Sequence, residues 1–485
     1  MKYYKCREED IGKSVLEVLA EAGELLPDTP CGGKGKCGKC RMQLAGSLSD
    51  MQEYERSLLG DDAEKGWRLA CLTTVQGDFE YSVSCQADAK VQLDFYPEQN
   101  IATDGGAGTV LAVDIGTTTV AVYKCSRADG EIVDRVSFVN PQRVHGADVI
   151  SRLVYAEDGG AEELKNEINA SLKEAVDKLK GARADYCVVC GNTVMQHFLC
   201  GEDASGIAKL PFKPATLFSD LRSFDFCDKV YTAPCVAAYV GGDITLGALA
   251  CSIDRVNELT LYIDIGTNGE IVLASPERIL CCAAAAGPAF EGGNIDCGMM
   301  ASEGAIRTVY SEDGEVVFAT IADTKPEGIC GSGLIDAVAT FLELEIMDET
   351  GRLEEERYYF SDKIFISQKD IRALQSAKAA IAAGVRTLCH EMGCDVGDIE
   401  RVIIAGGFGS HINAAKARRI GLIPYGCEAE MEYRGNCAGM GAVALAVNES
   451  LGDRLRELCN RMEYVELSGH KKFNEYYIDE MYFEE

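Results

Sequence analysis

The stretch "LAVDIGTTTVAVYKC" at residues 111–125 returns in altered form as "LYIDIGTNGEIVLAS" at residues 261–275. Leu, Asp, Ile, Gly and Thr recur at an offset of 150 residues. In each copy an apolar run ends in an acidic residue, and a glycine-centred turn with small hydroxyl side chains follows, as in a strand that enters a hairpin. Two such copies predict two related lobes, each built around a strand, a tight turn and a second strand.

The two turns have the chemistry of a magnesium–polyphosphate site. Backbone N–H groups and threonine hydroxyls of a glycine-rich turn bind phosphate oxygens, and a neighbouring carboxylate holds Mg²⁺, usually through water. We therefore expect Asp114 and Asp264 to be the magnesium carboxylates. The expected phosphate-binding residues are Gly116, Thr117, Thr118 and Thr119 in the first turn and Gly266, Thr267 and Asn268 in the second.

The paired turns resemble the actin-like ATPase superfamily, which includes acetate and sugar kinases, heat-shock chaperone ATPases and actin. Three further stretches follow the order of that superfamily. Residues 234–250 resemble its first interdomain helix, residues 401–413 its adenosine loop and residues 435–446 its second interdomain helix. The resemblance implies a two-lobed α/β ATPase with a duplicated ribonuclease H-like fold, with ATP and Mg²⁺ bound between the lobes.

Single residues receive roles only through this resemblance. It implies that Asp243 is the catalytic base, which orients a hydroxyl or a water at the γ-phosphate. Read alone, Asp243 could equally be a helix cap, and "AGGFGS" a flexible turn. The residues expected to contact the adenosine are Gly406, Gly407, Phe408, Gly409 and Ser410.

Four of the 22 cysteines stand apart by their spacing. Cys31, Cys37 and Cys40 share one glycine-rich loop, and Cys71 follows 31 positions later. Three thiolates on one loop with a distant fourth favour an iron–sulfur cluster. Structural zinc, the alternative, usually takes two separated C-x2-C pairs. The other cysteines lie in apolar segments and are expected to be small core residues in a reducing, anaerobic cytoplasm.

The segments around the cysteine loop resemble the β-grasp 2Fe–2S ferredoxins, an α+β fold. A short helix over residues 15–26 precedes the loop, strands over 40–46 and 78–84 follow it, and the usual first hairpin must be shortened. The whole chain is then divided into a ferredoxin-like domain (1–87), a linker (88–107), ATPase lobe I (108–252), ATPase lobe II (253–462) and a C-terminal tail (463–485).

Composition excludes several classes of function. The formal net charge is −31 with no offsetting basic run, so a nucleic-acid partner is not expected. No apolar run reaches the length of a membrane span. The N-terminus lacks the apolar core of a signal peptide. These features predict a cytoplasmic protein that does not associate with a membrane.

Five more segments resemble the reductive activators of corrinoid-dependent methyltransferases: residues 140–153, 190–199, 285–299, 328–338 and 366–381. That resemblance implies reduction of cob(II)amide to cob(I)amide on a corrinoid protein, with ATP and with electrons passed through the 2Fe–2S cluster. It implies two partners, a corrinoid protein and an external low-potential electron donor, and makes a homodimer plausible. The chain lacks the small additional domain of the better-known members, which bears on how far the cluster domain reaches.

Two other functions stay open at this stage. One is an ATP-driven electron donor for another low-potential metalloenzyme, and the other is a small-molecule kinase or ATPase whose cluster senses redox state. No D-x-H-x-x-G motif occurs, so a bound corrinoid is expected to belong to the partner. His145 and His197 are expected to be hydrogen-bonded structural residues, and Lys378 is a minor candidate for contact with the nucleotide.

Overall fold

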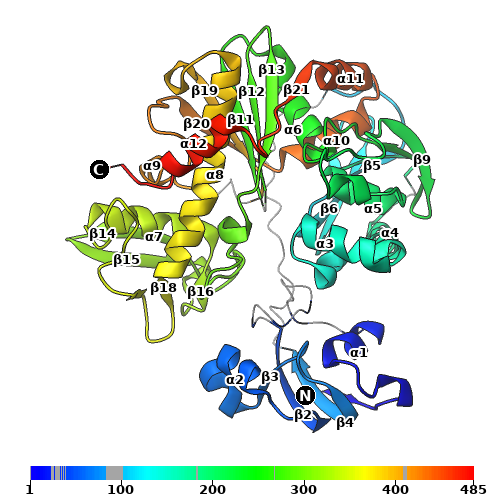
Figure 1. Ribbon diagram of the computed structural model, residues 1–485. Coiled ribbons are helices and arrows are strands. Elements are labelled where there is room, and N and C mark those ends of the chain that lie inside the picture. The colour runs from blue at the N-terminus through cyan, green and yellow to red at the C-terminus, as the bar shows by residue number, and fades with distance from the viewer. Residues whose placement is uncertain are drawn as a thin grey trace.

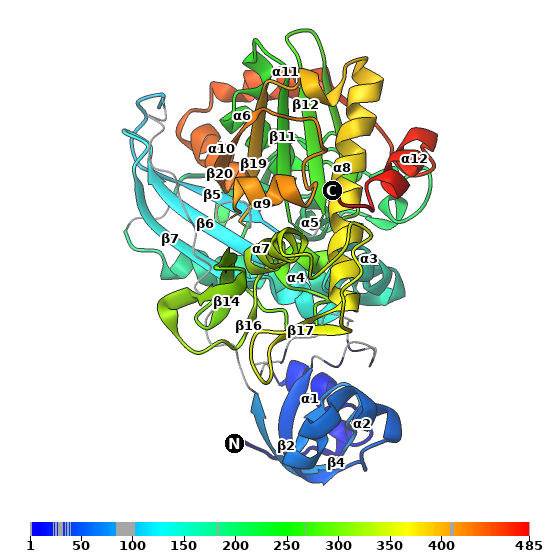
Figure 2. The same ribbon diagram turned by 90° about the vertical axis from the view of Figure 1, so that its left-hand side faces the viewer.

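The computed structural model shows a small N-terminal domain and two larger lobes (Figures 1 and 2). It describes residues 2–22, 24, 27, 33, 35, 38, 40–83, 102–181, 184–266, 268–407 and 412–484. Most of the linker predicted for residues 88–107 lies outside these ranges.

The N-terminal domain is a four-stranded sheet of order β1-β4-β2-β3 with two short helices. Its elements are β1 (Lys2–Tyr4), α1 (Val15–Glu21), β2 (Arg41–Leu48), α2 (Glu53–Leu59), β3 (Trp67–Leu69) and β4 (Val75–Val83). The predicted helix and both predicted strands are present, whereas α2 was not predicted. The expected first hairpin is reduced to the three residues of β1, which pair with β4 at the sheet edge.

Lobe I is a six-stranded sheet of order β7-β6-β5-β8-β10-β9. Its strands are β5 (Thr109–Ile115), β6 (Thr119–Ser126), β7 (Ile132–Val139), β8 (Tyr186–Gly191), β9 (Asp220–Phe224) and β10 (Cys227–Thr232). Its helices are α3 (Val149–Tyr155), α4 (Ala161–Lys178), α5 (Thr193–Cys200) and α6 (Gly242–Ala250). β5 and β6 form the predicted hairpin, and β8 lies parallel to β5 on the other side.

Lobe II repeats this arrangement in a sheet of order β20-β19-β11-β12-β13-β21. Its strands are β11 (Thr260–Ile265), β12 (Gly269–Ala274), β13 (Ile279–Ala284), β19 (Arg401–Ala405), β20 (Glu430–Gly435) and β21 (Met462–Tyr464). β11 is antiparallel to β12 and parallel to β19, as β5 is to β6 and β8. Five strands have the same order in both lobes, and the sixth joins opposite edges, β9 beside β10 and β21 beside β13. The internal repeat therefore marks two related lobes, which confirms the predicted duplicated fold.

A smaller subdomain is inserted into lobe II, and the long helix α8 runs from it along the lobe (Figure 1). It contains β14 (Ala305–Glu312), β15 (Glu315–Thr320), β16 (Gly328–Ile329), α7 (Gly331–Glu343), β17 (Arg357–Tyr359), β18 (Phe365–Ser367) and the start of α8 (Gln368–Met392). The remaining helices are α9 (Ala414–Arg419), α10 (Cys437–Val447), α11 (Leu451–Arg461) and α12 (Lys471–Asp479). Short helical turns are η1 (Glu8–Asp10), η2 (Gly60–Lys65), η3 (Pro141–His145), η4 (Ala156–Gly160), η5 (Ser205–Ile207), η6 (Ile253–Arg255), η7 (Pro288–Glu291), η8 (Ile321–Asp323) and η9 (Val396–Asp398).

The segment predicted as a C-terminal tail is folded onto lobe II. Helix α12 packs against α8, and Phe483 is buried in the core of the lobe. Lys378 of α8, the minor candidate for the nucleotide, is fully buried here and donates to the carbonyl oxygen of Tyr482 at 2.6 Å. This lysine thus anchors the end of the chain.

Helices α6 and α10 cross between the two lobes (Figure 1), as predicted for the two interdomain helices. Small residues let their backbones meet. A Cβ placed on Gly441 of α10 would lie 2.1 Å from the carbonyl oxygen of Leu246 in α6. No side chain fits at such a distance, so only glycine permits this crossing.

We expect Gly441→Ala to destabilise the protein by about 1–3 kcal/mol, because the added methyl group overpacks the crossing. Thermal unfolding should show a midpoint lower by several degrees. The matched control is Gly452→Ala in α11, where the nearest atom to an added Cβ is the flexible end of Arg456 at 3.6 Å. An unchanged midpoint for Gly441→Ala would contradict the tight crossing.

Candidate functional site

Three predicted aspartates meet where the two hairpins face each other. Asp114 and Asp264 are the penultimate residues of β5 and β11, and Asp243 lies in the first turn of α6. Burial raises the pKa of Asp114 to about 6. Burial and the charge of Asp114 raise the pKa of Asp264 to about 7. The structure therefore brings together carboxylates from three elements of the ATPase fold.

Asp243 is the most strongly affected of the three. Burial, then the charges of Asp264 and Asp114, raise its pKa to about 8. The three side chains are largely surrounded by protein yet remain partly accessible to solvent. Ionised carboxylates this close together repel one another, and a bound divalent cation would stabilise them by offsetting their charges. The donor set fits Mg²⁺, which prefers carboxylate oxygens and water.

Glu270 is a fourth carboxylate at this site, and the sequence analysis missed it. It lies on β12 opposite Asp264 in the register of the hairpin. Burial, then the charges of Asp243 and Asp264, hold its pKa well above the usual range. A signal was available in the repeat, because Glu270 stands where the first copy has Val120. A charged residue at an apolar position of a repeat marks a functional difference between the lobes.

Asn436 is a second missed residue, and it links the far end of the chain to the first hairpin. Its side-chain amide donates to Asp114 Oδ2 at 2.8 Å, while its oxygen accepts from Gly439 N and caps α10. The same amide lies 3.3 Å from the Tyr123 hydroxyl. A movement of α10 would therefore change the position of the Asn436 amide relative to the Asp114 carboxylate.

The predicted adenosine loop begins beside the second hairpin. Gly406 has a φ of +94°, and a Cβ there would lie 2.7 Å from Asp264 Oδ1 and 2.5 Å from the Ile265 carbonyl oxygen. Gly266 N donates to Asn268 O at 2.9 Å and closes the hairpin turn, as Gly116 N does to Thr119 O in lobe I. Thr267, Phe408, Gly409 and Ser410 lie outside the described residues.

The two described cysteines of the predicted cluster site converge in the N-terminal domain. Cys40 Sγ and Cys71 Sγ are 3.1 Å apart, and neither forms a disulfide. Glu55 holds this region in place, because it pairs with Arg68 at 2.8 Å and accepts from Leu69 N at 2.9 Å. Thiols that converge beside a loop turned by positive-φ glycines (Gly33, Gly35 and Gly38) suit an iron–sulfur cluster. Cys31 and Cys37 lie outside the described residues.

Two other predictions concern histidines. The ring of His197 is fully buried and its Nδ1 lies 2.6 Å from the Thr193 carbonyl oxygen, as expected for a structural residue. His145 contacts Glu167 through Nε2 at 2.9 Å and stacks on Tyr155. Neither histidine lies among the carboxylates of the hairpins.

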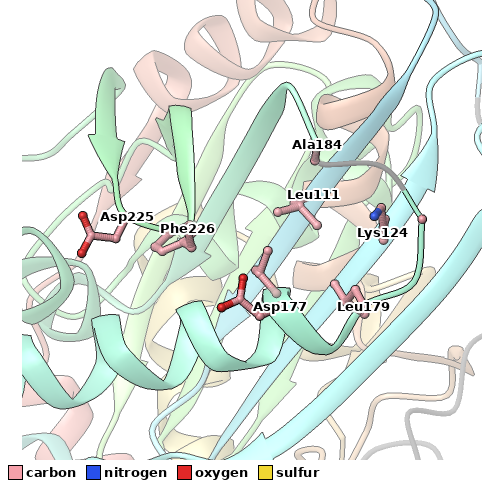
Figure 3. Close-up of a pocket in the computed structure, with 9 residues that line it drawn as sticks. Leu111, Lys124, Asp177, Leu179, Ala184, Asp225 and Phe226 are labelled. Carbon is pink, nitrogen blue, oxygen red and sulfur yellow. The ribbon is translucent and has the colours of Figure 1, made fainter.

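A cavity of about 320 Å³ opens elsewhere on lobe I (Figure 3). Lys124 lines it together with apolar side chains such as Leu111, Leu179 and Phe226. The lysine is already engaged, since its Nζ donates to the Lys180 carbonyl oxygen at 2.8 Å. None of the hairpin carboxylates lines this cavity, so it is separate from the site described above.

Among the described helices, none is long and apolar enough to cross a membrane.

Comparison with protein families assigns most of the chain, and the predicted linker lies outside the three matched regions. Residues 5–76 match the 2Fe–2S iron–sulfur cluster binding domain. Residues 109–256 match the family described as the RACo middle region. Residues 258–485 match the C-terminal domain of RACo, described as the ASKHA domain. The N-terminal domain is thus a 2Fe–2S domain, which decides against structural zinc, and the two lobes have the ATP-binding fold predicted from the repeat.

Individual relatives agree with these assignments. A protein of Eubacterium limosum named corrinoid activation enzyme RamQ is 31% identical over 418 residues, which are 76% of this chain and 69% of that protein. A Co(II) methylated amine-specific corrinoid protein reductase of Methanosarcina barkeri is 27% identical over 277 residues, 52% of this chain and 51% of that protein. The solved structure of a reductive activator for a corrinoid, iron–sulfur protein superimposes with a TM-score of 0.72 at 28% identity, over 97% of this chain and 95% of that one.

Proposed function

The chain belongs to the RACo family of corrinoid activation enzymes, and from this premise we propose that it reduces the cobalt of a partner's corrinoid from Co(II) to Co(I). The reaction consumes ATP and takes its electrons through a 2Fe–2S cluster. The single observation that carries this function is the union, in one chain, of converging cluster cysteines and an ASKHA carboxylate site.

Cluster binding and nucleotide chemistry are assigned to different residues of the chain. Cys31, Cys37, Cys40 and Cys71 hold the cluster, which supplies one-electron transfer when bound. Asp114 and Asp264 hold Mg²⁺ with the nucleotide phosphates, and Glu270 adds a further carboxyl group to this site. Asp243 orients the water that attacks the γ-phosphate. Gly406 and the loop that follows it accommodate the adenosine.

The electron balance of the reaction is simple. The Co(II) of the partner's corrinoid gains one electron and becomes Co(I), and an external low-potential donor replaces that electron on this protein. ATP and water become ADP and phosphate in the same cycle. Hydrolysis changes how the two lobes close, and lobe closure changes how a docked partner is held.

An anaerobic reduction assay tests this function. The protein is first reduced, then mixed with MgATP and a corrinoid protein in the Co(II) state, and the absorbance of cob(I)amide is followed. We expect cob(I)amide to form with MgATP and to disappear from the assay when EDTA removes the magnesium. ATP turnover with no change at cobalt would instead support a redox-sensing ATPase, and phosphate transfer to a metabolite would support a kinase.

A further inference from the structure

Arg152 is the largest fully buried side chain in the described part of the protein. It belongs to α3 and to the segment 140–153, whose role the proposed function leaves unexplained. Its guanidinium donates to the carbonyl oxygens of Thr117 and Gly146 and approaches Gln142 Oε1 at 3.4 Å and Met195 Sδ at 3.3 Å. None of these acceptors is a carboxylate.

A buried cation that no carboxylate neutralises is costly to keep in a protein. Burial lowers the pKa of Arg152 to about 9, and the like charge of Arg143 adds to this effect, while Asp148 and Glu167 oppose it. The guanidinium therefore remains charged at neutral pH. Such a group is expected where an anion compensates for it, and the first phosphate-binding turn is its neighbour.

The contact with Thr117 fixes the direction of one peptide unit. Arg152 Nη2 lies 2.5 Å from the Thr117 carbonyl oxygen. The peptide bond to Thr118 is trans, so its N–H points away from its carbonyl. When Arg152 holds the carbonyl inside lobe I, the N–H of Thr118 is turned to the opposite side.

Asn140 acts in the same way on the preceding peptide unit. Its Nδ2 donates to the Gly116 carbonyl oxygen at 2.9 Å, which turns the N–H of Thr117 outward. Asn192 Nδ2 also donates to the Thr117 hydroxyl at 2.9 Å. Within the described residues, neither the Thr117 N–H nor the Thr118 N–H donates to a protein acceptor. Both donors are left for a ligand.

We propose that Arg152 is a positioning residue for ATP: it holds the Thr117 carbonyl inside lobe I, aims the Thr118 N–H at a nucleotide phosphate and adds buried positive charge behind the turn. Asn140 performs the matching task for the Thr117 N–H. This inference rests on the proposed ATP site and deepens it by naming what orients the first turn.

Equilibrium binding of MgATP to Arg152→Met and Arg152→Lys tests the proposal. A hydrogen bond from a charged donor is worth enough that its loss should weaken MgATP binding about 10- to 100-fold in Arg152→Met. The KM for MgATP should rise by a similar factor while kcat changes little. Arg152→Lys, which keeps the charge and one donor, should recover part of the affinity.

Arg222→Met is the matched control, since Arg222 is a largely buried arginine of lobe I that pairs with Glu202 instead of the turn. It should leave the KM for MgATP unchanged. If Arg152→Met fails to fold, Asn140→Ala provides the same test and should weaken MgATP binding several-fold. Unaltered affinity in the folded variants would overturn this inference alone, whereas a wild-type protein that does not bind MgATP would overturn the proposed function itself.

Discussion

An Asp243→Asn variant is expected to lose ATP hydrolysis by about 100- to 10,000-fold, the usual contribution of a positioned general base. The substitution keeps the shape of the side chain, and the amide oxygen can still accept from Ile244 N, as the carboxylate does at 2.8 Å. What disappears is the carboxyl group that, once ionised, orients the attacking water and takes its proton. ATP-dependent formation of cob(I)amide should fall with hydrolysis.

The affinity for MgATP should change far less than the rate, because Asp114 and Asp264 remain to hold the cation. Asp453→Asn is the matched control, since Asp453 lies exposed on α11, where it pairs with neighbouring Arg456. Hydrolysis at the wild-type rate in Asp243→Asn would remove Asp243 from the mechanism. Released phosphate and cob(I)amide are measured on the same samples.

A Cys71→Ala variant is expected to lose the cluster and, with it, all reduction of the corrinoid. Cys71 is one of four predicted thiolate ligands, and its sulfur lies beside that of Cys40. With one ligand missing, the iron content should drop and the visible absorbance of the 2Fe–2S centre should disappear. The ATPase lobes form their own cores, so MgATP binding should be retained.

Cys6→Ser is the control for that variant. Cys6 belongs to the same domain, but its thiol donates to the neighbouring Arg7 carbonyl oxygen and it is not among the four spaced cysteines. It should keep both iron and activity. Full iron content and normal reduction in Cys71→Ala would show that the cluster is held by a different set of cysteines.

The sequence predicted most of the fold because both lobes begin with the same hairpin. Asp114 and Asp264 were found for that reason, and the structure brings them together with Asp243. The residues that were missed contact partners far from them in the sequence. Asn436 contacts Asp114 across 322 positions, and Arg152 contacts Thr117 across 35. Local pattern carries no information about such contacts.

Other differences have local causes. Helix α2 has seven residues, too few for a clear helical period, and the pairing of Glu55 with Arg68 supports it. The segment after residue 463 is rich in charged and aromatic residues, which made it look like a tail. This segment is held by contacts with α8, where Lys378 donates to its backbone and the core of lobe II buries its apolar side chains.

We propose that nucleotide hydrolysis drives an electron uphill from the cluster domain to a partner's cobalt. The most direct measurement poises the protein and a corrinoid protein at a potential where the cluster is reduced and the cobalt stays Co(II), then adds MgATP and follows cob(I)amide and ADP together. We expect cob(I)amide and ADP to appear together, and a non-hydrolysable ATP analogue to produce neither. Equal reduction of cobalt without nucleotide, or ADP formation while all the cobalt stays Co(II), would contradict it.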